Sequence, residues 1–365
     1  MSETIVDHAA DEEPARRAHG DPARRGSGGG RRRRTLRRVI MAAAVTVVVL
    51  VGAIAGVGFL VVNHALGMIH RISGIAALTA AHQPVMPAIS RGSMTVLLTG
   101  AKVLPTSRVG DGALDSSGVP EEESGLIALV HLNAGDRGGA VVSIPPDAVV
   151  DIPGHGRLEL WRAMQIGGPS LLIRSVEHLT NVRINHYSVL DFSGVSSIVS
   201  AINGVDVTVP TPFSSDGVAF PAGIDDLNAS TVLPYVRQAD VSEVGRTLLQ
   251  QNLIRAILTK IGQEHLFGPV ADYHLIDDTA SALSVDSNFT DRQLIALTLG
   301  LSRLRGRDGV FVSAATTNGS PTAGGDQPVY LNRVIDGDLW QAIRHDSVRT
   351  FARRFPTTVT PTSPF

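Results

Sequence analysis

The segment that decides the fold is GLIALVHLNAGDRGGAVVSIPPDAVVDIPGHG, residues 125–156. Two apolar runs rich in β-branched residues flank a turn that begins at Asn133 and ends with Gly138 and Gly139. Such runs on either side of a Gly-rich turn predict a hairpin of two buried strands. The second strand is followed by Asp147. Polar residues just past the end of a central strand often form the ligand site of an α/β protein.

The segments on either side of this hairpin alternate between extended and helical spacing. Extended runs occur at residues 94–100, 184–190, 205–209, 310–315 and 329–332. Helical spacing occurs at residues 169–180, 192–202, 230–238, 244–262, 291–303 and 335–344. Strands that alternate with helices are typical of an α/β protein whose helices cover the sheet. We therefore expect a layered α-β-α domain with a mixed central sheet.

The N-terminal part of the chain differs from the rest in composition. Residues 1–38 are rich in Gly, Arg and acidic residues and almost free of large apolar groups, which predicts a disordered tail. Residues 39–62 (VIMAAAVTVVVLVGAIAGVGFLVV) carry no charge. A helix of that length spans about 36 Å, enough to cross a hydrocarbon core of about 30 Å. This stretch predicts one transmembrane helix, an uncleaved signal anchor.

Arginines precede the apolar stretch directly, at residues 31–34 and 37–38. By the positive-inside rule, they predict a single-pass protein of the cell membrane with a cytoplasmic N-terminus and an extracytoplasmic main domain. We expect a juxtamembrane spacer at residues 63–90, the extracytoplasmic domain at residues 91–350 and a flexible tail at residues 351–365.

The charge distribution argues against a nucleic-acid partner. Residues 1–38 hold ten of the 32 Lys and Arg and six of the 34 Asp and Glu, so the remaining chain has a formal charge of −6. A domain of that sign is a poor match for a polyanion. The chain has no cysteine. An exported domain without disulfides must be stabilised by its apolar core, and a domain of about 300 residues buries roughly 75% of its unfolded surface.

Several motifs occur together in order between residues 94 and 262. They are Val142-Ser143-Ile144-Pro145, Ile184-Asn185-His186-Tyr187, Asp191-Phe192-Ser193-Gly194, Gly204-Val205-Asp206-Val207-Thr208-Val209-Pro210, Asp216-Gly217-Val218-Ala219-Phe220-Pro221-Ala222-Gly223, Tyr235-Val236-Arg237 and Gly245-Arg246 with Gln250-Gln251. In this core match the chain resembles the LytR-CpsA-Psr (LCP) family of cell-envelope proteins and is identified as a divergent member. The expected topology fits, because the family carries one N-terminal span and an outer catalytic domain.

The resemblance implies a chemistry. Family members are similar to phosphotransferases that take a glycopolymer from a polyprenyl-pyrophosphate carrier and join it to peptidoglycan or a related wall glycan. Arginines suit the pyrophosphate, because a planar fork pairs two phosphate oxygens at once. A magnesium ion held by two aspartates would neutralise charge as the phosphoryl group moves. The implied partners are a polyprenyl phosphate or lipid-linked glycan, peptidoglycan or a wall glycan, and the membrane.

The resemblance assigns catalytic candidates residue by residue. Arg237 matches the first arginine of the family's Tyr-Val-Arg-x-Arg motif. Arg246 matches the first arginine of its Asp-x-x-Arg-x-x-Arg-Gln motif, and Asp147 matches the aspartate of Ser-Ile-Pro-Arg-Asp. The alternative interpretation is a solvated helix face with scattered surface charge.

Three further residues are phosphate-binding candidates. Gln250 closes the helix motif, and its spacing of four from Arg246 puts both side chains on one helix face. Arg157 falls where the family has a lysine. Lys102 would place an ammonium where the metal ion is expected, and an ammonium can hold a phosphate as a point charge. A surface lysine at a strand end is the simpler interpretation of Lys102.

The chain departs from the family at the positions that carry the metal. The two aspartates that would hold magnesium are replaced by Lys102 and Gly125, so we expect no metal ligands and no cofactor. Three family arginines are also replaced, by Pro146, Ala239 and Leu249. Loss of one preorganised donor at a developing charge typically costs about 10²–10³ in rate.

Three hypotheses follow from the sequence. The chain is a non-catalytic relative that binds polyprenyl phosphates or wall glycans, an active phosphotransferase with a rearranged site, or a membrane-anchored scaffold without a ligand. The family resemblance favours activity, and the missing ligands favour binding without catalysis.

Overall fold

A computed structural model describes residues 64–79, 83–101, 126–136, 138–237, 243–263, 280–304, 309–317 and 328–359. These residues belong to one compact unit that begins at Gly58. The predicted tail at residues 1–38 and the predicted membrane span at residues 39–62 lie outside the described residues, as do Lys102 and Gly125. Among the helices in the described ranges, none has the length and hydropathy to cross a bilayer.

A seven-stranded sheet forms the centre of the unit, with the strand order β1-β12-β7-β2-β3-β4-β13. The strands are β1 (His70–Ile72), β2 (Met94–Ala101), β3 (Ile127–Leu132), β4 (Gly139–Ser143), β7 (His186–Asp191), β12 (Leu283–Asp286) and β13 (Gly309–Ser313). Strands β7, β2, β4 and β13 run in one direction, and β1, β12 and β3 run in the other. The prediction of an α/β fold with a mixed central sheet is confirmed.

The hairpin predicted at residues 125–156 is present as the antiparallel pair β3–β4. Its turn contains the short 3-10 segment η3 (Ala134–Asp136), and Gly138 has a positive φ of 84°. Gly139 lies so close to the opposite strand that a Cβ would sit 2.2 Å from the His131 carbonyl oxygen. Glycine at this position therefore allows the two strands to meet at the turn.

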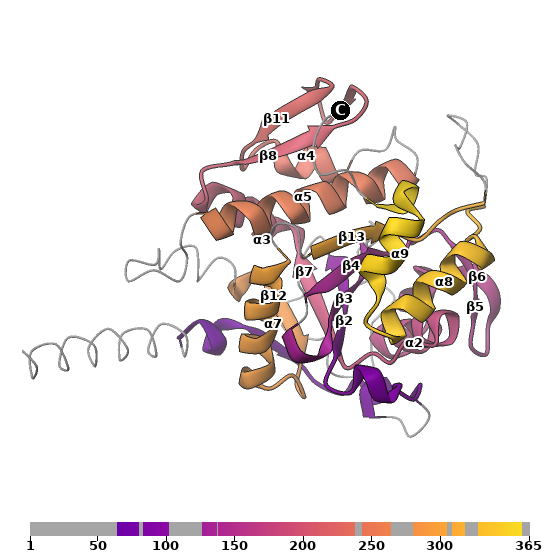
Figure 1. Cartoon of the computed structure of the whole chain (residues 1–365). Helices are drawn as coiled ribbons and strands as arrows, with labels where there is room; N and C mark the ends of the chain where they lie inside the picture. Colours follow the sequence, from indigo (N-terminus) through magenta and orange to yellow (C-terminus); the bar gives the residue numbers. More distant parts are fainter. Residues whose placement is uncertain are drawn as a thin grey trace, which may run out of the picture. The chain divides into compact units, whose positions relative to one another are not determined.

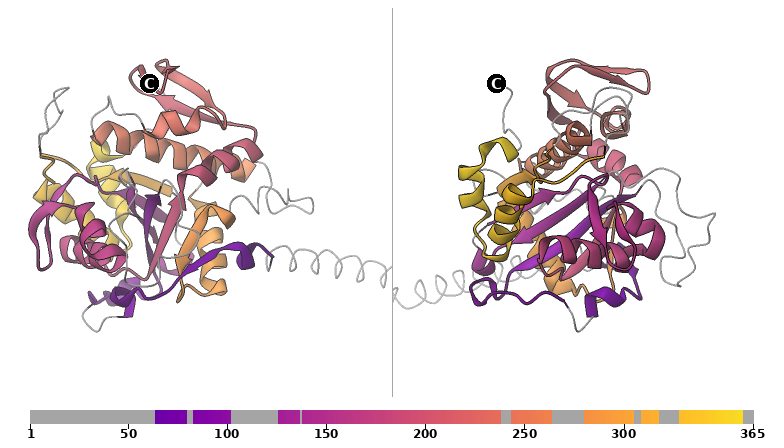
Figure 2. Two further views of the ribbon diagram at one scale, coloured as in Figure 1. Left: turned by 180° about the vertical axis from the view of Figure 1, so that it is seen from behind. Right: turned by 90° about the vertical axis from the view of Figure 1, so that its right-hand side faces the viewer.

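Helices cover both faces of the sheet (Figures 1 and 2). Helices α2 (Arg162–Thr180), α8 (Arg333–Arg344) and α9 (Val348–Arg354) pack on one face, where Leu97 and Leu129 belong to the buried cluster. Helix α7 (Asp291–Arg303) packs on the other face, against the neighbouring residues Val96 and Val130. Successive strand residues point to opposite faces, which is why adjacent apolar residues fill two separate cores.

A third apolar cluster joins the small outer sheets to three helices. Helices α3 (Phe192–Ala201), α4 (Val232–Arg237) and α5 (Glu243–Gln263) pack with β8 (Val205–Val209), which pairs antiparallel with β11 (Gly223–Leu227). Strands β9 (Phe213–Ser215) and β10 (Val218–Phe220) form the adjoining hairpin. Figure 1 shows β8 and β11 together above α5.

Smaller elements complete the unit. Strands β5 (Val149–Ile152) and β6 (Gly156–Glu159) form a hairpin directly before α2. Helix α2 starts earlier than the predicted residue 169 because the chain is already helical from Arg162 and then bends at Gly167 and Gly168. Further 3-10 segments are η1 (Ala76–Thr79), η2 (Ala88–Ser90) and η4 (Pro356–Thr358).

The structure corrects two predicted boundaries. The spacer predicted at residues 63–90 contains β1, which pairs with β12 as the edge strand of the main sheet. The tail predicted from residue 351 begins later, because α9 continues to Arg354 and Phe351 is buried in the main core. Both segments are held by partners far away in the sequence, so local composition did not reveal them.

The strand predicted at residues 329–332 is not formed. Val329 and Leu331 make isolated bridges to Ala148 and Thr316 instead of a continuous ladder. Conversely, the sequence did not predict β12, a strand of four residues whose Asp286 accepts hydrogen bonds from the Tyr187 backbone (3.0 Å) and His186 Nδ1 (3.1 Å).

Candidate functional site

Four strands of the sheet end at the same edge, because β7, β2, β4 and β13 all run in one direction. Their last residues are Asp191, Ala101, Ser143 and Ser313, respectively. Ala101 pairs in register with Asp191, and Ser143 pairs with Ser313. Strand β3 begins at this edge, where Gly100 N donates to Leu126 O at 3.1 Å. We refer to the sheet edge at which β7, β2, β4 and β13 end as the carboxyl edge.

Asp147 lies at the carboxyl edge in the turn that follows β4 and is half-buried. Backbone hydrogen bonds hold this turn from two sides: Trp161 N donates to Pro146 O at 3.0 Å, and Val149 N donates to Val329 O at 2.8 Å. The turn therefore positions Asp147 between the start of α2 and the segment before α8.

Helix α5 is fixed against the end of β13 by Gln251. The Gln251 Nε2 atom donates to Val312 O at 2.7 Å, and Ser313 Oγ donates to Gln251 Oε1 at 3.4 Å. Gln250 is buried as well, and Arg246 is half-buried. Because Arg246 lies five residues before Gln251, it is displaced by about 7.5 Å along the helix axis. The anchored glutamine thus brings the start of α5 close to the carboxyl edge.

The three remaining predicted site residues are Arg237, Arg157 and Lys102, and the structure describes only the side chain of Arg157. Arg237 is the last residue of α4, and its side chain lies outside the described part. Arg157 is exposed on β6, with its guanidinium carbon 5.7 Å from the centre of the Tyr330 ring. Lys102 lies outside the described residues and follows directly on Ala101.

A buried carboxyl group lies next to the end of β13. Asp336 on α8 accepts a hydrogen bond from Ala315 N at 2.8 Å through Oδ1. Burial raises the pKa of Asp336 to about 7, although hydrogen bonds from the Ala315 and Asn332 backbones act to lower it. The carboxyl end of β13 is therefore held by a group that is largely protonated below neutral pH.

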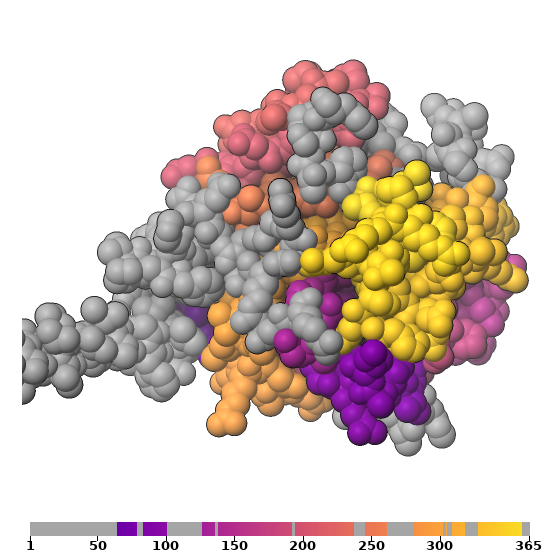
Figure 3. Space-filling model, viewed as in Figure 1, coloured from indigo at the N-terminus to yellow at the C-terminus, as the bar shows by residue number. Residues whose placement is uncertain are grey.

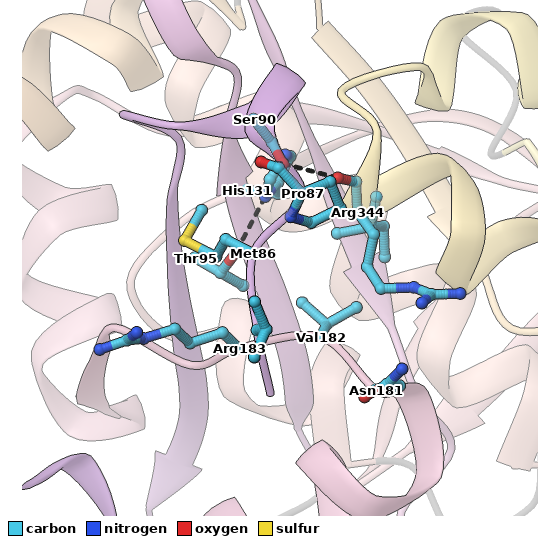
Figure 4. A pocket seen from close by; sticks show the side chains of 11 residues that line it. Met86, Pro87, Ser90, Thr95, His131, Asn181, Val182, Arg183 and Arg344 are labelled. Atoms are coloured by element: carbon cyan, nitrogen blue, oxygen red, sulfur yellow. Dashed lines mark hydrogen bonds between the residues drawn. The ribbon is translucent and has the colours of Figure 1, made fainter. Parts of the chain in front are cut away.

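A recess at the opposite edge of the sheet contains about 250 Å³ of empty space, open solvent included. Figure 4 shows His131 and Thr95 within it and the side chains of Arg183 and Arg344 extending away from each other. No predicted site residue lines this recess. Its arginines do not converge, so it offers no site for one anion.

The comparisons with known proteins agree with this architecture. The model of the LytR_cpsA_psr family matches residues 74–348, three quarters of the chain. The chain belongs to this family.

Among curated relatives of the LytR_cpsA_psr family, polyisoprenyl-teichoic acid–peptidoglycan teichoic acid transferase TagU of Enterococcus faecalis is 30% identical over 208 residues, 56% of this chain. The match spans 64% of that transferase, less than two thirds of its length. The protein of the same name from Bacillus anthracis is 26% identical over 253 residues, which are 67% of this chain and 80% of that one.

Solved structures share the fold of this LytR_cpsA_psr member. A LytR-Csp2A-Psr enzyme from Actinomyces oris superposes with a TM-score of 0.55 and 19% identity, over 75% of this chain and 95% of that one. A structure described as TagT bound to LIIa-WTA gives a TM-score of 0.52 and 22% identity, over 73% and 97%. At this level of identity the likeness establishes the fold.

The described part of the family's expected metal site holds few ligands. Asp147 and Asp191 are carboxylates at the carboxyl edge, and the buried Asp336 lies next to the end of β13. Within the described segments, no three His, Asp or Glu side chains gather into a metal-binding group. The two expected ligand positions, Lys102 and Gly125, have no carboxylate. We therefore derive no chemical step through a metal ion.

The sequence analysis contains Asp191 and Gln251 within the family motifs but did not name them as site residues. Asp191 is in register with Ala101 in the neighbouring strand, and Gln251 anchors α5. Asp191 directly follows the predicted strand at residues 184–190, the same signal that identified Asp147. The side-by-side arrangement of β7 and β2 was needed to see that Asp191 is in register with Ala101, the residue before Lys102.

Proposed function

We propose that this chain is a membrane-anchored, extracytoplasmic protein of cell-wall assembly that binds polyprenyl-(pyro)phosphate-linked glycans through a degenerate phosphotransferase site. The observation that carries the proposal is the replacement of both expected metal aspartates, by Lys102 and Gly125, in a chain that belongs to the family. The names of curated relatives support the substrate class, since they describe transfer of polyisoprenyl-linked teichoic acid to peptidoglycan.

The retained polar groups support binding of a phosphate. Asp147 and the start of α5 lie by the carboxyl edge, and α5 carries Arg246. Guanidinium groups bind phosphate without a metal, because their fork matches two phosphate oxygens. Catalysis is more demanding than binding, since charge that develops in the transition state has to be neutralised by preorganised donors or an ion. Loss of the metal ligands therefore reduces catalysis more than binding.

Lys102 favours a second candidate function. In this alternative, the chain is an active glycopolymer–peptidoglycan phosphotransferase with a rearranged site. An ammonium at this position would supply one positive charge where the family uses the ion. It cannot bridge several phosphate oxygens as an octahedral magnesium ion does. A third outcome, a scaffold without a ligand, would leave the arginines without a binding role.

The test is mass spectrometry of lipid that co-purifies with the full chain from a bacterial host. We expect a polyprenyl phosphate with the natural sequence and its loss in the Arg237→Ala, Arg246→Ala double variant. The matched control is Arg174→Ala with Arg353→Ala, two exposed arginines on α2 and α9, which should retain the lipid. Absence of lipid from the natural sequence would favour the scaffold.

Activity is measured separately, as magnesium-dependent release of polyprenyl phosphate from a pyrophosphate-linked glycan. We expect no release above the background without protein. Release that disappears in the Lys102→Ala variant would establish the rearranged enzyme instead.

The proposed location follows from the predicted span at residues 39–62 and the arginines before it. Labelling of single-cysteine variants in intact cells tests it, because the natural chain contains no cysteine. A cysteine at the exposed Val334 should react with a membrane-impermeant maleimide, and one placed in residues 1–38 should not. The reverse pattern would contradict the proposed topology.

A further inference from the structure

The outer face of α7 is apolar although it is exposed. Leu294 and Leu297 on its inner side are buried against the sheet. Ile295 and Leu299 point outward, with 40% and 47% of their surface exposed. Their spacing of four puts them on one stripe, so the helix is apolar on both sides. An isolated surface helix normally carries polar residues on its outer face.

The first described segment of the chain runs beside this helix. Residues 64–68 are helical, and Met68 is 37% exposed. Three residues later, Arg71 forms an ion pair of 2.6 Å with Asp291 and also donates to Phe289 O. These contacts fix the segment to the N-terminal end of α7, and Figures 1 and 2 show the two side by side from opposite directions.

The predicted anchor is only a short distance along the chain from the ion pair between Arg71 and Asp291. The apolar stretch ends at residue 62, and Arg71 is nine residues further on. With residues 64–68 helical, these nine residues span at most about 20 Å. A domain of about 300 residues has a radius of gyration of about 19 Å and is roughly 50 Å across. A tether shorter than the domain holds the surface around Arg71 near the bilayer.

We propose that the outer face of α7, with Ile295, Leu299 and the neighbouring Met68, rests on the outer surface of the membrane that holds the anchor. The exposed Arg292 on the same helix face adds a positive charge for anionic head groups. The α7 part of this surface belongs to the orange region at the lower left of Figure 3, which the yellow C-terminal helices leave uncovered.

A protein partner is the other kind of occupant that an exposed apolar face could have. The short tether favours the bilayer, because it keeps α7 close to lipid whether or not any protein is present. The inference rests on the predicted anchor of the proposed function. It does not depend on the binding of a lipid-linked glycan.

Fluorescence quenching by lipid-borne nitroxides tests the proposal on the full chain. The natural sequence has no cysteine, so Ile295→Cys and Leu299→Cys can each carry one bimane label. The matched controls are Ile224→Cys on β11 and Val334→Cys on α8, whose native side chains are 65% and 78% exposed. Each protein is reconstituted in nanodiscs of phosphatidylethanolamine and phosphatidylglycerol with shallow doxyl lipids.

We expect labels at positions 295 and 299 to lie within about 10 Å of the head-group boundary and to be quenched about twofold more than the control labels. Equal quenching at all four positions would overturn the proposal. Labels at 295 and 299 that are shielded from aqueous iodide but not quenched by lipid would assign the face to a protein partner. A chain that does not remain in the nanodisc would overturn the anchor and this inference together.

A second variant separates this inference from the proposed function. With the label at Met68→Cys, the exposed substitutions Ile295→Glu and Leu299→Glu should reduce lipid quenching, since charge opposes insertion at the interface. Co-purification of polyprenyl phosphate is read independently by mass spectrometry. Quenching that the two glutamates leave unchanged would contradict this inference alone, and absence of polyprenyl phosphate from the natural sequence would contradict the proposed function alone.

Discussion

His131 Nε2 lies 2.9 Å from Asp346 Oδ1, although 215 residues separate the two in sequence. On its other side, His131 Nδ1 is 2.9 Å from Thr95 Oγ1. Asp346 also accepts hydrogen bonds from Ser93 Oγ at 2.8 Å and from Ala134 N at 2.9 Å. Burial acts to raise the pKa of Asp346, but these bonds and the His131 charge outweigh it and leave the pKa below its ordinary value. The network ties the α8–α9 junction to β2 and β3.

Replacement of Asp346 should therefore destabilise the domain strongly. Asp346→Ala leaves the Ala134 N–H, Ser93 and His131 without their acceptor, at a cost of about 3 kcal/mol. Thermal unfolding followed by circular dichroism should show a melting temperature lower by roughly 5–10 °C. The control is Asp338→Ala, which removes a more exposed ion pair with Arg354 and should cost less than about 1 kcal/mol. Equal shifts in both variants would contradict the assigned role of the network.

The buried Glu177 predicts a loss of stability as pH rises. Burial raises its pKa from 4.5 to about 7, although the Ile184 N–H donates to Oε1 at 2.9 Å. Since the folded state holds this proton more tightly than the unfolded state, the group destabilises the fold progressively between about pH 4.5 and 7.

Glu177→Gln keeps the acceptor for Ile184 and removes the charge. We expect its melting temperature to fall less than that of the natural chain between pH 4.5 and 7. Glu159→Gln, at a more exposed carboxylate on β6 paired with Arg162, should leave the pH profile unchanged. Parallel profiles for Glu177→Gln and the natural chain would show that Glu177 is not the titrating group.

Replacement of Gly168 and of Gly337 by alanine should change the free energy of unfolding in opposite directions. Gly168 has φ 60° and ψ −160° at the bend in α2, a conformation that costs of order 1–3 kcal/mol for other residues. Gly337 lies within α8, and a Cβ there would meet no atom within 4 Å. Gly168→Ala should lower the free energy of unfolding, and Gly337→Ala should raise it by up to about 1 kcal/mol. Denaturant titration measures both, and a stabilised Gly168→Ala variant would be inconsistent with the observed bend.

Restoring two aspartates should create a magnesium site if the scaffold of the edge is retained. The bond from Gly100 N to Leu126 O brings together the strand ends that lead to Lys102 and Gly125. We expect the variant with Lys102→Asp and Gly125→Asp to bind Mg²⁺ by titration calorimetry. The variant with both positions changed to Ala is the control. A folded aspartate variant without a binding heat would count against the alignment of these two positions.

The elements predicted best are those specified by local sequence. The helix at residues 291–303 and the strand at residues 205–209 are confirmed with the same bounds. Thr290 caps that helix through a reciprocal bond with Gln293, a signal contained in four consecutive residues. The β3–β4 hairpin was equally readable, because its apolar runs and glycine turn are adjacent in the chain.

The candidate site was only partly accessible from sequence. Family motifs identified Asp147, Arg246 and Gln250, and the missing metal ligands at Lys102 and Gly125 are a property of the sequence alone. The sequence did not show that Asp191 stands in register with Ala101. That relation depends on the order of strands in the sheet, which local patterns do not encode.

The amino-acid sequence by itself determined the class of fold, the hairpin at its centre, the family motifs and the apolar stretch near the N-terminus. Periodicity and turn chemistry act between near neighbours, so they can be read along the chain. Tertiary structure alone decided that β1 and β12 complete the sheet, that α9 closes the core and that His131 meets Asp346. These features come from contacts between distant segments, whose partners are selected by packing and by the satisfaction of buried polar groups.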